Sequence, residues 1–319
     1  MARSGESREG VSLTNLDEPL FDRAGATKRD LVDYLDAVAD RIIPELADRP
    51  LSVVRVHRGQ EAFMQKNLPK YAPDWIRRHP MWAEASRREV TYALCDDRRT
   101  LLWFANQRAV EYHPTLFRAE RPEHPTHLVL DLDPPESRGG VAAGFRKAVA
   151  AAHLVRRALA DAGLDGTVKT SGAKGVHVVV PVADDVTHED AAAATRAIAA
   201  RAEQLDPELA TTAFLKDDRG GKVFVDATRA GGATVVAAYS PRARPGVPVS
   251  FPIAWDDLDQ VTPADFTIHT ALDQLAPTAT ITPQQLPSDL VEEGTTIPTA
   301  RVQAMHEGKR RAKARRDAR

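Results

Sequence analysis

The stretch HLVLDLDPP, residues 127–135, ends in alternating leucines and aspartates before two prolines. This alternation predicts a β-strand, whose successive side chains point to opposite faces of a sheet. Asp131 and Asp133 therefore share one face at the carboxyl end of the strand. Two carboxylates so close repel each other unless a cation lies beside them. Mg²⁺ and Mn²⁺ prefer oxygen ligands of this kind, so the pair is a candidate metal site; capping of the following turn is the structural alternative.

A second strand also ends in an acidic residue. The segment KVFVDAT, residues 222–228, places Asp226 directly after an apolar run. Three carboxylates from two strands can hold one or two divalent ions, which stabilise the attacking and leaving oxygens of a phosphoryl displacement. Taken alone, Asp226 also fits a turn at the end of a strand.

A loop of small residues lies between two further strands. The segment TSGAKGVHVVVP, residues 170–181, contains Ser171, Lys174 and His177. Glycines allow backbone N–H groups to approach phosphate oxygens closely, and these three side chains can donate hydrogen bonds to them. The loop is not a P-loop, because it lacks the Gly-Lys-Ser/Thr ending and leads into a strand. A plain turn is the alternative for this loop considered by itself.

Arginines follow in the second half of the chain. The segment YSPRARPG, residues 239–246, supplies Arg242 and Arg244, and Arg229 lies upstream. Because arginine can bind phosphate oxygens in a bidentate manner, these residues are candidates for holding a triphosphate.

The composition is that of a soluble protein with an ordinary core. The chain has 319 residues, of which 43% are hydrophobic and 28% charged, and its net charge is −2. This balance does not by itself indicate a nucleic-acid binder, so any basic surface is expected to be local. The single cysteine, Cys95, excludes a disulfide framework and a Cys-rich zinc site, and no apolar run is long enough to cross a membrane. We therefore expect a cytoplasmic protein.

The mixture of strands and helices predicts an α+β or α/β sheet fold in two lobes. Thr27 can cap a helix whose apolar residues recur at helical spacing. The apolar stripe of residues 101–113 predicts a second helix, with His113 at its carboxyl end, where a cationic side chain is favourable. Residues 222–228 and 233–240 are expected to pair as a hairpin about Gly231 and Gly232. Other strands are expected at residues 51–56, 61–67, 90–95, 127–133, 167–170 and 177–182, and other helices at 145–163 and 188–204.

The two ends of the chain differ from the rest in composition. Residues 1–11 are small, polar and charged, and we expect them to be disordered. The folded domain is expected to cover residues 12–288. Residues 289–319 form a polar tail that ends in the basic run GKRRAKARRDAR, residues 308–319. This run is expected to be solvated, with contacts to a phosphate backbone as the alternative.

Taken together, the motifs resemble the polymerase domain of bacterial ATP-dependent DNA ligase D, which belongs to the archaeo-eukaryotic primase superfamily. The resemblance runs from about residue 12 to about residue 275 and rests on segments in the same order: LTNLDEPLF (13–21), TKRDLVDYL (27–35), FMQKN (63–67), PDWI (73–76), LLWFANQRAVEYHP (101–114), DLDP (131–134), SGAKGVHVVVP (171–181), FVDATR (224–229) and YSPRARPGVPVS (239–250). It implies an α+β, archaeo-eukaryotic primase-like fold, with mixed central β-sheets flanked by helices and a smaller N-terminal lobe.

The resemblance also implies roles for particular residues. Asp131, Asp133 and Asp226 are the implied catalytic residues and ligands of a two-metal site for Mn²⁺ or Mg²⁺. The implied nucleotide-binding residues are His113, beside the sugar, and Ser171, Lys174, His177, Arg229 and Arg242, at the phosphates. The implied DNA-binding residues are Lys28, in a pocket for a downstream 5′-phosphate, Phe63, on the template path, and Arg55 and Lys66.

The implied function is template-dependent addition of nucleotides, preferentially ribonucleotides, to primer 3′ ends at short gaps or breaks during DNA repair by non-homologous end joining. The implied partners are gapped or broken DNA with a 5′-phosphate, NTP or dNTP substrates, a separate ligase and Ku. We expect a monomer that is associated with the nucleoid and not with a membrane. Because the sequence contains no K-x-D-G ligase motif, a stand-alone polymerase domain is expected.

Two other functions use the same residues. The first is a metal-dependent phosphohydrolase or nuclease built on the three aspartates. The second is a non-catalytic module that binds DNA ends, in which the carboxylates only maintain the structure. The residues directed at a triphosphate favour the polymerase over both.

The sequence departs from the family pattern at three positions. Glu18 stands where many relatives have a lysine that serves the 5′-phosphate. Met64 replaces the second phenylalanine of a stacking pair, and Ala230 replaces a common asparagine.

Overall fold

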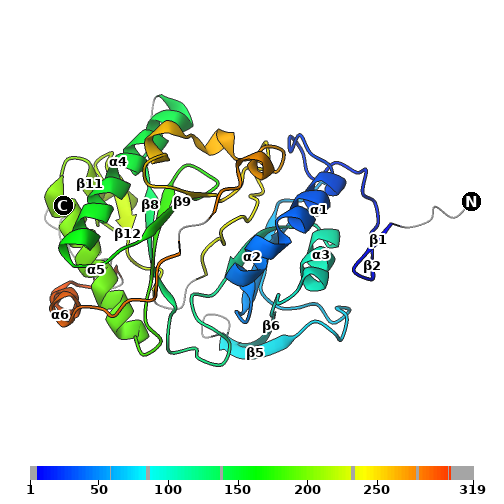
Figure 1. Ribbon diagram of the computed structural model, residues 1–319, viewed down its shortest axis with the longest axis horizontal. Helices are drawn as coiled ribbons and strands as arrows, with labels where there is room; N and C mark the ends of the chain where they lie inside the picture. Colours follow the sequence, from blue (N-terminus) through cyan, green and yellow to red (C-terminus); the bar gives the residue numbers. More distant parts are fainter. Residues whose placement is uncertain are drawn as a thin grey trace, which may run out of the picture. The chain divides into compact units, whose positions relative to one another are not determined.

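The computed structural model divides the chain into two compact units, each assembled from several segments (Figure 1). Unit 1 consists of Met1–Pro122, Lys169–Ala173 and Thr234–Thr280, and unit 2 of Glu123–Val168, Lys174–Ala233 and Ile281–Arg319. The structure describes residues 6–57, 59–83, 87–136, 139–230, 234–277, 280–300 and 302.

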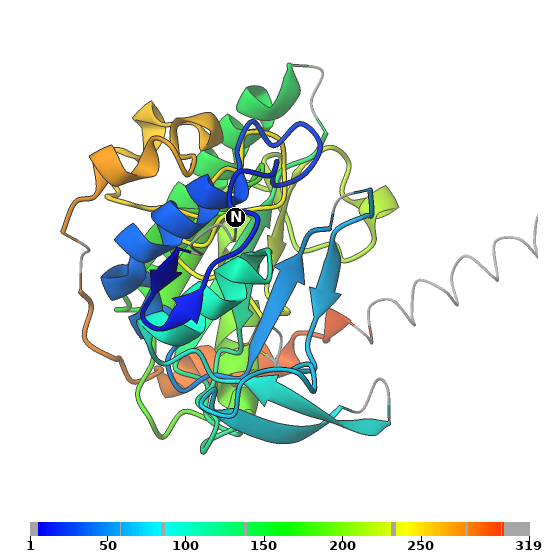
Figure 2. The ribbon, with the colours of Figure 1, turned by 90° about the vertical axis from the view of Figure 1, so that its right-hand side faces the viewer.

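Unit 1 is a five-stranded antiparallel sheet with helices packed against it. In the sheet, β3 (Leu51–Arg55) pairs with β4 (Phe63–Gln65), β6 (Arg88–Ala93) and β7 (Ala109–Pro114), and β5 (Arg78–Ala83) pairs with β6. Figure 2 shows the two hairpins, β3–β4 in blue and β5–β6 in cyan. The helices are α1 (Lys28–Ala37), α2 (Ala39–Leu46) and α3 (Arg98–Asn106), and β13 (Pro252–Ile253) lies further along the chain. Their apolar side chains form one buried cluster.

Helix α1 begins at the predicted residue. The Thr27 hydroxyl accepts a hydrogen bond from the backbone N–H of Asp30 at 3.2 Å, and the Asp30 carboxylate accepts one from the Thr27 N–H at 2.7 Å. This reciprocal pair is a capping box, which satisfies donors that the first turn leaves free. Leu31 and Leu35, four residues apart, are fully buried.

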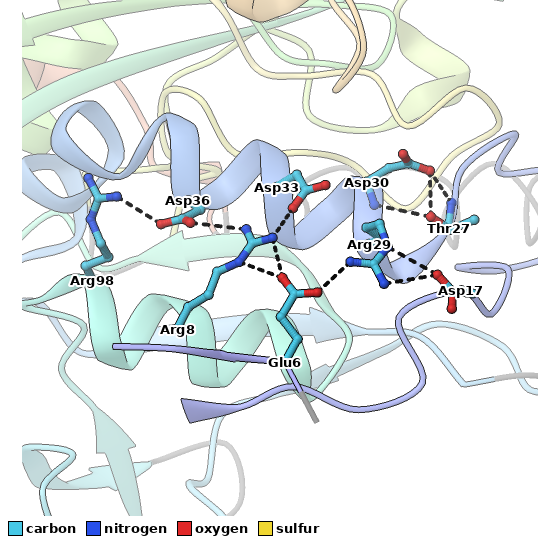
Figure 3. A network of polar contacts seen from close by, with 9 residues as sticks. All are labelled: Glu6, Arg8, Asp17, Thr27, Arg29, Asp30, Asp33, Asp36 and Arg98. Atoms are coloured by element: carbon cyan, nitrogen blue, oxygen red, sulfur yellow. Dashed lines mark hydrogen bonds and ion pairs between the residues drawn. The ribbon is translucent and has the colours of Figure 1, made fainter. Parts of the chain in front are cut away.

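The N-terminal region is ordered further than the composition suggested. Residues 6–11 were expected to be disordered, but β1 (Ser7–Arg8) and β2 (Val11–Ser12) form a hairpin. Charged side chains in and just before the hairpin pair with charged side chains of α1: Arg8 Nη2 lies 2.6 Å from Asp33 Oδ1, and Glu6 Oε2 lies 2.6 Å from Arg29 Nη1 (Figure 3). Residues 1–5 lie outside the described residues.

The predicted helix at residues 101–113 is wrong in its second half. Helix α3 ends at Asn106, Arg108 adopts a positive φ of 61°, and residues from Ala109 onward form β7. The alternate side chains Val110 and Tyr112 are both buried, because β7 pairs along β3. His113 therefore lies on a strand and does not cap a helix.

Unit 2 is built on a sheet in which β8 (His127–Asp133) lies between β12 (Val223–Asp226) and β10 (Val176–Pro181), antiparallel to both (Figure 1). The short β11 (Ala210–Thr211) runs parallel to β12, and β9 (Thr167–Thr170) follows β10 in the sheet order. Helices α4 (Gly140–Asp161) and α5 (His188–Leu205) pack against each other and against the sheet. Helix α4 ends as predicted before Gly163, whose φ of 71° suits a residue without a side chain.

The predicted hairpin of residues 222–228 with 233–240 does not form. Strand β12 pairs with β8 and β11 instead, so its partners come from elsewhere in unit 2. Thr234, which belongs to unit 1, bridges to Thr115, and the Ala237 N–H donates to the carbonyl of Tyr112. Both segments thus satisfy their backbone groups with other partners. The proposed turn at Gly231 and Gly232 lies outside the described residues.

Part of the expected tail is a helix. Helix α6 (Ser288–Thr296) packs on α5, with Leu290 fully buried and the backbone of Gly294 directly against that of Ala193. Arg201 and Glu293 form an ion pair across the two helices, with 2.5 Å between Nη2 and Oε2. The polar composition of this segment did not predict the helix, because a helix needs only a narrow apolar stripe to pack on its neighbour. Residues 303–319 fall outside the described part of the chain.

No helix among the described residues is long and apolar enough to cross a lipid bilayer.

We predict that Gly294→Ala destabilises unit 2, because a Cβ at this position would overlap the backbone of Ala193. Such overpacking costs about 1–3 kcal/mol, which a urea-unfolding midpoint will report. Gly144→Ala in α4 is the matched control, because its Cβ would meet the Pro135 carbonyl at an ordinary 3.4 Å. Ala is favoured over Gly inside a helix by about 0.5–1 kcal/mol, so this variant should gain stability. Equal midpoints for the two variants would contradict the close packing of α6.

Candidate functional site

Three carboxylates lie on one face of the sheet in unit 2. In the antiparallel register of β8 and β12, Asp226 is directly opposite Asp131, and Phe224 is opposite Asp133. Residues two apart on a strand share a face, so Asp133 points to the same side as Asp131 and Asp226. The alternate side chains Leu130 and Leu132 are fully buried on the opposite face. Strand pairing therefore brings Asp226 next to Asp131, which lies about 95 positions earlier in the sequence.

Two basic side chains contact these carboxylates. The Arg229 Nη2 atom lies 2.9 Å from Asp131 Oδ2 and 3.2 Å from Asp226 Oδ2, so one nitrogen touches both groups. On the other side, His177 Nε2 lies 3.3 Å from Asp131 Oδ1, since β10 places His177 opposite Asp131. Arg229 and His177 thus partly neutralise the acidic face.

The carboxylates differ in their electrostatic environment. Burial by itself raises the pKa of Asp131, but the charges and hydrogen bonds of His177 and Arg229 bring it well below the usual value. The pKa of Asp133 is raised, first by burial and then by the nearby charge of Asp131, with Lys174 acting in the opposite direction. Positive charge is therefore concentrated at Asp131, and Asp133 is left the less neutralised of the two.

The acidic face fits a divalent cation in its chemistry. Its donors are carboxylate oxygens, which Mg²⁺ and Mn²⁺ prefer, and the Arg229 nitrogen already occupies a cation position between Asp131 and Asp226. Across the described ranges, no three acidic, histidine or cysteine side chains converge closely enough to ligate one ion as they stand. The residues that could hold a metal here are Asp131, Asp133 and Asp226, after Arg229 moves aside.

Arg219 also belongs to this face, although the sequence did not single it out. Its guanidinium stacks on Phe224 at 3.7 Å from the ring centroid, and its charge lowers the pKa of Asp133 against the larger effect of burial. The guanidinium donates to the carbonyls of Ala213 and Phe214. Arg219 precedes β12 in a turn, where no periodic pattern marks it.

In unit 1, Arg242 lies beside the loop that begins at Ser171. Arg242 Nη1 donates to the carbonyl of Ser171, while the Ser171 hydroxyl accepts from the Ala173 N–H at 3.2 Å. Gly172 has a φ of 66°, and a Cβ there would approach Arg242 Cγ to 2.6 Å. Only glycine fits this position without displacing Arg242.

A buried carboxylate, Glu111, joins Arg242 and His113 within unit 1. Glu111 Oε2 lies 2.8 Å from His113 Nε2 and 3.1 Å from Arg242 Nε. The sequence interpretation missed Glu111 because residues 101–113 were expected to be helical. On a strand, positions 111 and 113 share a face, and this relation would have identified it.

A separate pocket of about 350 Å³ in unit 1 is rich in positive charge. Its lining residues are Thr14, Asn15, Glu18, Lys28, Arg55, His57, Asn106, Gln107 and Arg108. Lys28 Nζ donates to the Thr14 carbonyl at 2.5 Å and to Asn106 Oδ1 at 2.6 Å. Burial, followed by the charge of Arg108, lowers the pKa of Lys28 to about 8, although Glu18 acts in the opposite direction. Three cations against one carboxylate make this pocket suited to an anion.

The other predicted DNA-binding residues are Arg55, which also lines the pocket, and Phe63 and Lys66. They differ in exposure. Phe63 on β4 is 39% exposed and stacks on His57, with 5.5 Å between ring centroids. The Arg55 guanidinium lies 5.9 Å from the centroid of the same ring. Lys66 is exposed just after β4.

The predicted residues thus fall into groups that the two units hold separately. Unit 2 brings together Asp131, Asp133, Asp226, His177 and Arg229, with Lys174 close enough to influence Asp133. Unit 1 contains Ser171, Arg242 and His113, and also Lys28, Arg55, Phe63 and Lys66.

Comparison with known families matches residues 27–281 to the family described as LigD, primase-polymerase domain. The bifunctional non-homologous end joining protein LigD of Bacillus subtilis is 34% identical over 270 residues, which cover 83% of this chain and 42% of that protein. The multifunctional non-homologous end joining DNA repair protein LigD of Mycobacterium tuberculosis is 36% identical over 281 residues, or 85% of this chain and 36% of that protein. The chain therefore spans less than half the length of these relatives.

Among solved structures, the polymerase domain from Mycobacterium tuberculosis ligase D in complex with DNA is similar to this chain. Its TM-score is 0.75 and its sequence identity 35%, over 83% of this chain and 93% of that chain. This likeness confirms the predicted α+β, primase-like fold.

We predict that Arg229→Met lowers the thermal midpoint of the protein in EDTA, because Asp131 and Asp226 lose the cation between them. Leaving buried groups without a partner costs about 1–3 kcal/mol. Mn²⁺ should then raise the midpoint more in the variant than in the wild type, since no arginine competes for the carboxylates. Arg157→Met, at an exposed position of α4, is the control and should behave as wild type. An equal Mn²⁺ shift in both proteins would argue against competition.

Proposed function

This chain belongs to the LigD primase-polymerase domain family, and from that membership we propose that it is a template-dependent nucleotidyltransferase. It adds nucleotides, preferentially ribonucleotides, to primer 3′ ends at short gaps or breaks in DNA. The observation that carries the proposal is the placement of Asp226 opposite Asp131, with Asp133 on the same face. A family polymerase needs such a set of carboxylates, and a fold without it would not support the function.

In the proposed reaction, the primer 3′-hydroxyl attacks the α-phosphate of a nucleoside triphosphate and pyrophosphate leaves. Asp131, Asp133 and Asp226 would hold divalent ions, Mn²⁺ or Mg²⁺, and such ions would lower the pKa of the attacking hydroxyl and neutralise the phosphates. The residues proposed to donate hydrogen bonds to phosphate oxygens are those that the family resemblance implies: Ser171, Lys174, His177, Arg229 and Arg242. Most of the acceleration comes from positioning and charge stabilisation.

The proposed DNA contacts lie in unit 1. The similarity to a ligase D polymerase domain in complex with DNA supports a nucleic-acid substrate. Phe63, which is exposed and backed by His57, offers a ring on which a template base stacks. Arg55 and Lys66 contribute positive charge to the same region.

We assign the pocket around Lys28 to a downstream 5′-phosphate. The pocket is large enough for a phosphate group, and Lys28, Arg55 and Arg108 outweigh the charge of Glu18. Although Glu18 replaces a lysine of many relatives, Arg108 lies 3.5 Å from its carboxylate and supplies positive charge at the same place. A separate ligase and Ku are the proposed partners in end joining.

We predict that the double variant Asp131→Ala/Asp133→Ala loses primer extension by at least about 1,000-fold, because the ions lose two ligands. The assay is extension on a gapped duplex, with rNTPs or dNTPs and with Mg²⁺ or Mn²⁺. Binding to the same DNA should change little. Asp184→Ala/Asp185→Ala, two exposed aspartates of unit 2, is the matched control. Degradation of labelled DNA would favour a nuclease, and salt-sensitive binding with no incorporation would favour a binding module.

We also predict that preference for a 5′-phosphate falls as pH rises from 7 to 9. The pKa of Lys28 is about 8, so its ammonium is charged below that pH and neutral above it. The ratio of affinities for phosphate-ended and hydroxyl-ended DNA should fall by up to about tenfold over this range. Lys28→Arg should keep its preference at pH 9, because a guanidinium stays charged. If the ratio of affinities in the wild type does not change with pH, Lys28 does not bind the 5′-phosphate.

A further inference from the structure

Glu111 is a buried acidic residue for which the proposed reaction has no direct use. It lies on β7, where it is opposite Val54 of β3, and only 7% of its surface is exposed. Its side chain shares a face with that of His113, two residues further along the strand. A buried carboxylate is costly unless it is paired, so its partners show what it does.

Both oxygens of the Glu111 carboxylate are engaged within unit 1. Oε2 contacts His113 Nε2 at 2.8 Å and Arg242 Nε at 3.1 Å. Oε1 accepts a hydrogen bond from the backbone N–H of Ala243 at 2.9 Å. The Arg242 Nε–H is not aligned for a hydrogen bond, so that contact is an ion pair. One side chain therefore holds a histidine, an arginine and the backbone next to that arginine.

The carboxylate is ionised at neutral pH. Burial alone raises the pKa of Glu111, but the hydrogen bond with His113 and the charge of Arg242 lower it to about 2. An ionised carboxylate only accepts hydrogen bonds, so the ring nitrogen facing it must carry a proton. In the neutral ring of His113, the proton is then on Nε2, and Nδ1 is the acceptor.

The second ring nitrogen is directed elsewhere. Within the described part of the chain, the one hydrogen bond of the His113 ring is made through Nε2. Nδ1 is therefore available to a ligand, and as an acceptor it can receive a hydrogen bond from a sugar hydroxyl. A deoxyribose lacks the 2′-hydroxyl and cannot make this bond at that position.

We propose that Glu111 is a positioning residue that sets the tautomer of His113 and the orientation of Arg242 together. This inference rests on the proposed function, together with the roles that the family resemblance implies for His113, beside the sugar, and for Arg242, at the phosphates. Because both side chains depend on the same carboxylate, discrimination between ribose and deoxyribose is coupled to binding of the triphosphate. Glu111 itself touches no substrate atom in this arrangement.

The variant Glu111→Gln tests the proposal with little change in side-chain volume. The amide oxygen of glutamine can still accept from the Ala243 N–H, which turns its NH₂ group toward His113 and Arg242. An NH₂ group donates, so His113 Nε2 must become an acceptor and the proton moves to Nδ1. The ion pair with Arg242 is lost at the same time.

The first measurement is the nitrogen NMR spectrum of the His113 ring, without nucleotide or DNA. The Nε2–H tautomer is expected in the wild type and the Nδ1–H tautomer in Glu111→Gln. Glu89→Gln, an exposed position of β6 in the same unit, is the matched control and should keep the wild-type spectrum. A wild-type ring protonated on Nδ1 would overturn the inference even if the Glu111 variant failed to fold.

The second measurement is primer extension with paired rNTP and dNTP substrates. Displaced catalytic groups cost up to about 100-fold, so Glu111→Gln should lower kcat/KM for rNTPs by about 10- to 100-fold, mainly through KM. The preference for ribose should fall, because Nδ1 can no longer accept from the 2′-hydroxyl, which must turn its lone pair toward Nδ1–H instead. DNA affinity and the unfolding midpoint of folded Glu111→Gln should stay near those of Glu89→Gln.

The two outcomes separate this inference from the proposed function. If the wild type extends no primer, the polymerase proposal fails. The NMR measurement of the His113 tautomer still tests whether Glu111 sets that tautomer, because it needs no substrate. If the wild type extends primers and Glu111→Gln keeps both its ring tautomer and its ribose preference, the inference fails alone. A loss of stability without a change in tautomer would identify Glu111 as purely structural.

Discussion

The pairing of β8 with β12 imposes the electrostatic constraint on which the candidate site depends. It places Asp226 opposite Asp131 and keeps Asp133 on the same face, so three negative groups share a partly buried surface. Charges repel more strongly there than in water, because the surroundings are less polar. Arg229 and His177 offset the repulsion at Asp131 and Asp226. Burial and then the charge of Asp131 raise the pKa of Asp133, and a further cation would stabilise its charged form.

Unit 1 contains the opposite arrangement of charge. Around Glu111, one carboxylate is offset by the cation of Arg242. In the pocket at Lys28, Glu18 is outweighed by Lys28, Arg55 and Arg108. That pocket of unit 1 therefore favours anions, whereas the acidic face of unit 2 favours cations. This division matches the chemistry of a nucleotidyltransferase, whose substrates are polyanions and whose cofactors are divalent ions.

Local sequence signals predicted the elements whose ends depend on neighbouring residues. Thr27 begins α1 through a contact with Asp30, and Gly163 ends α4 through its own backbone conformation. Signals failed where the deciding partner is distant in the sequence. The stripe of residues 101–113 is compatible with a helix, but β7 forms because β3 offers it an edge. Similarly, α6 exists because the backbone of Gly294 fits directly against α5, which no pattern within residues 288–296 reveals.

The same distinction explains which site residues could be found in advance. Asp131, Asp133 and Arg242 stand out by residue type and motif, and no knowledge of their partners is needed to notice them. Glu111 and Arg219 are ordinary charged residues, and their significance comes from what they contact. For Glu111 the error in secondary structure was decisive: in a helix, residues two apart point in different directions, whereas on β7 they meet the same neighbour. When a strand is predicted as a helix, two residues that are two positions apart are not expected to share a face. The partner of a residue recognised by its motif, such as Glu111 beside His113, is then missed.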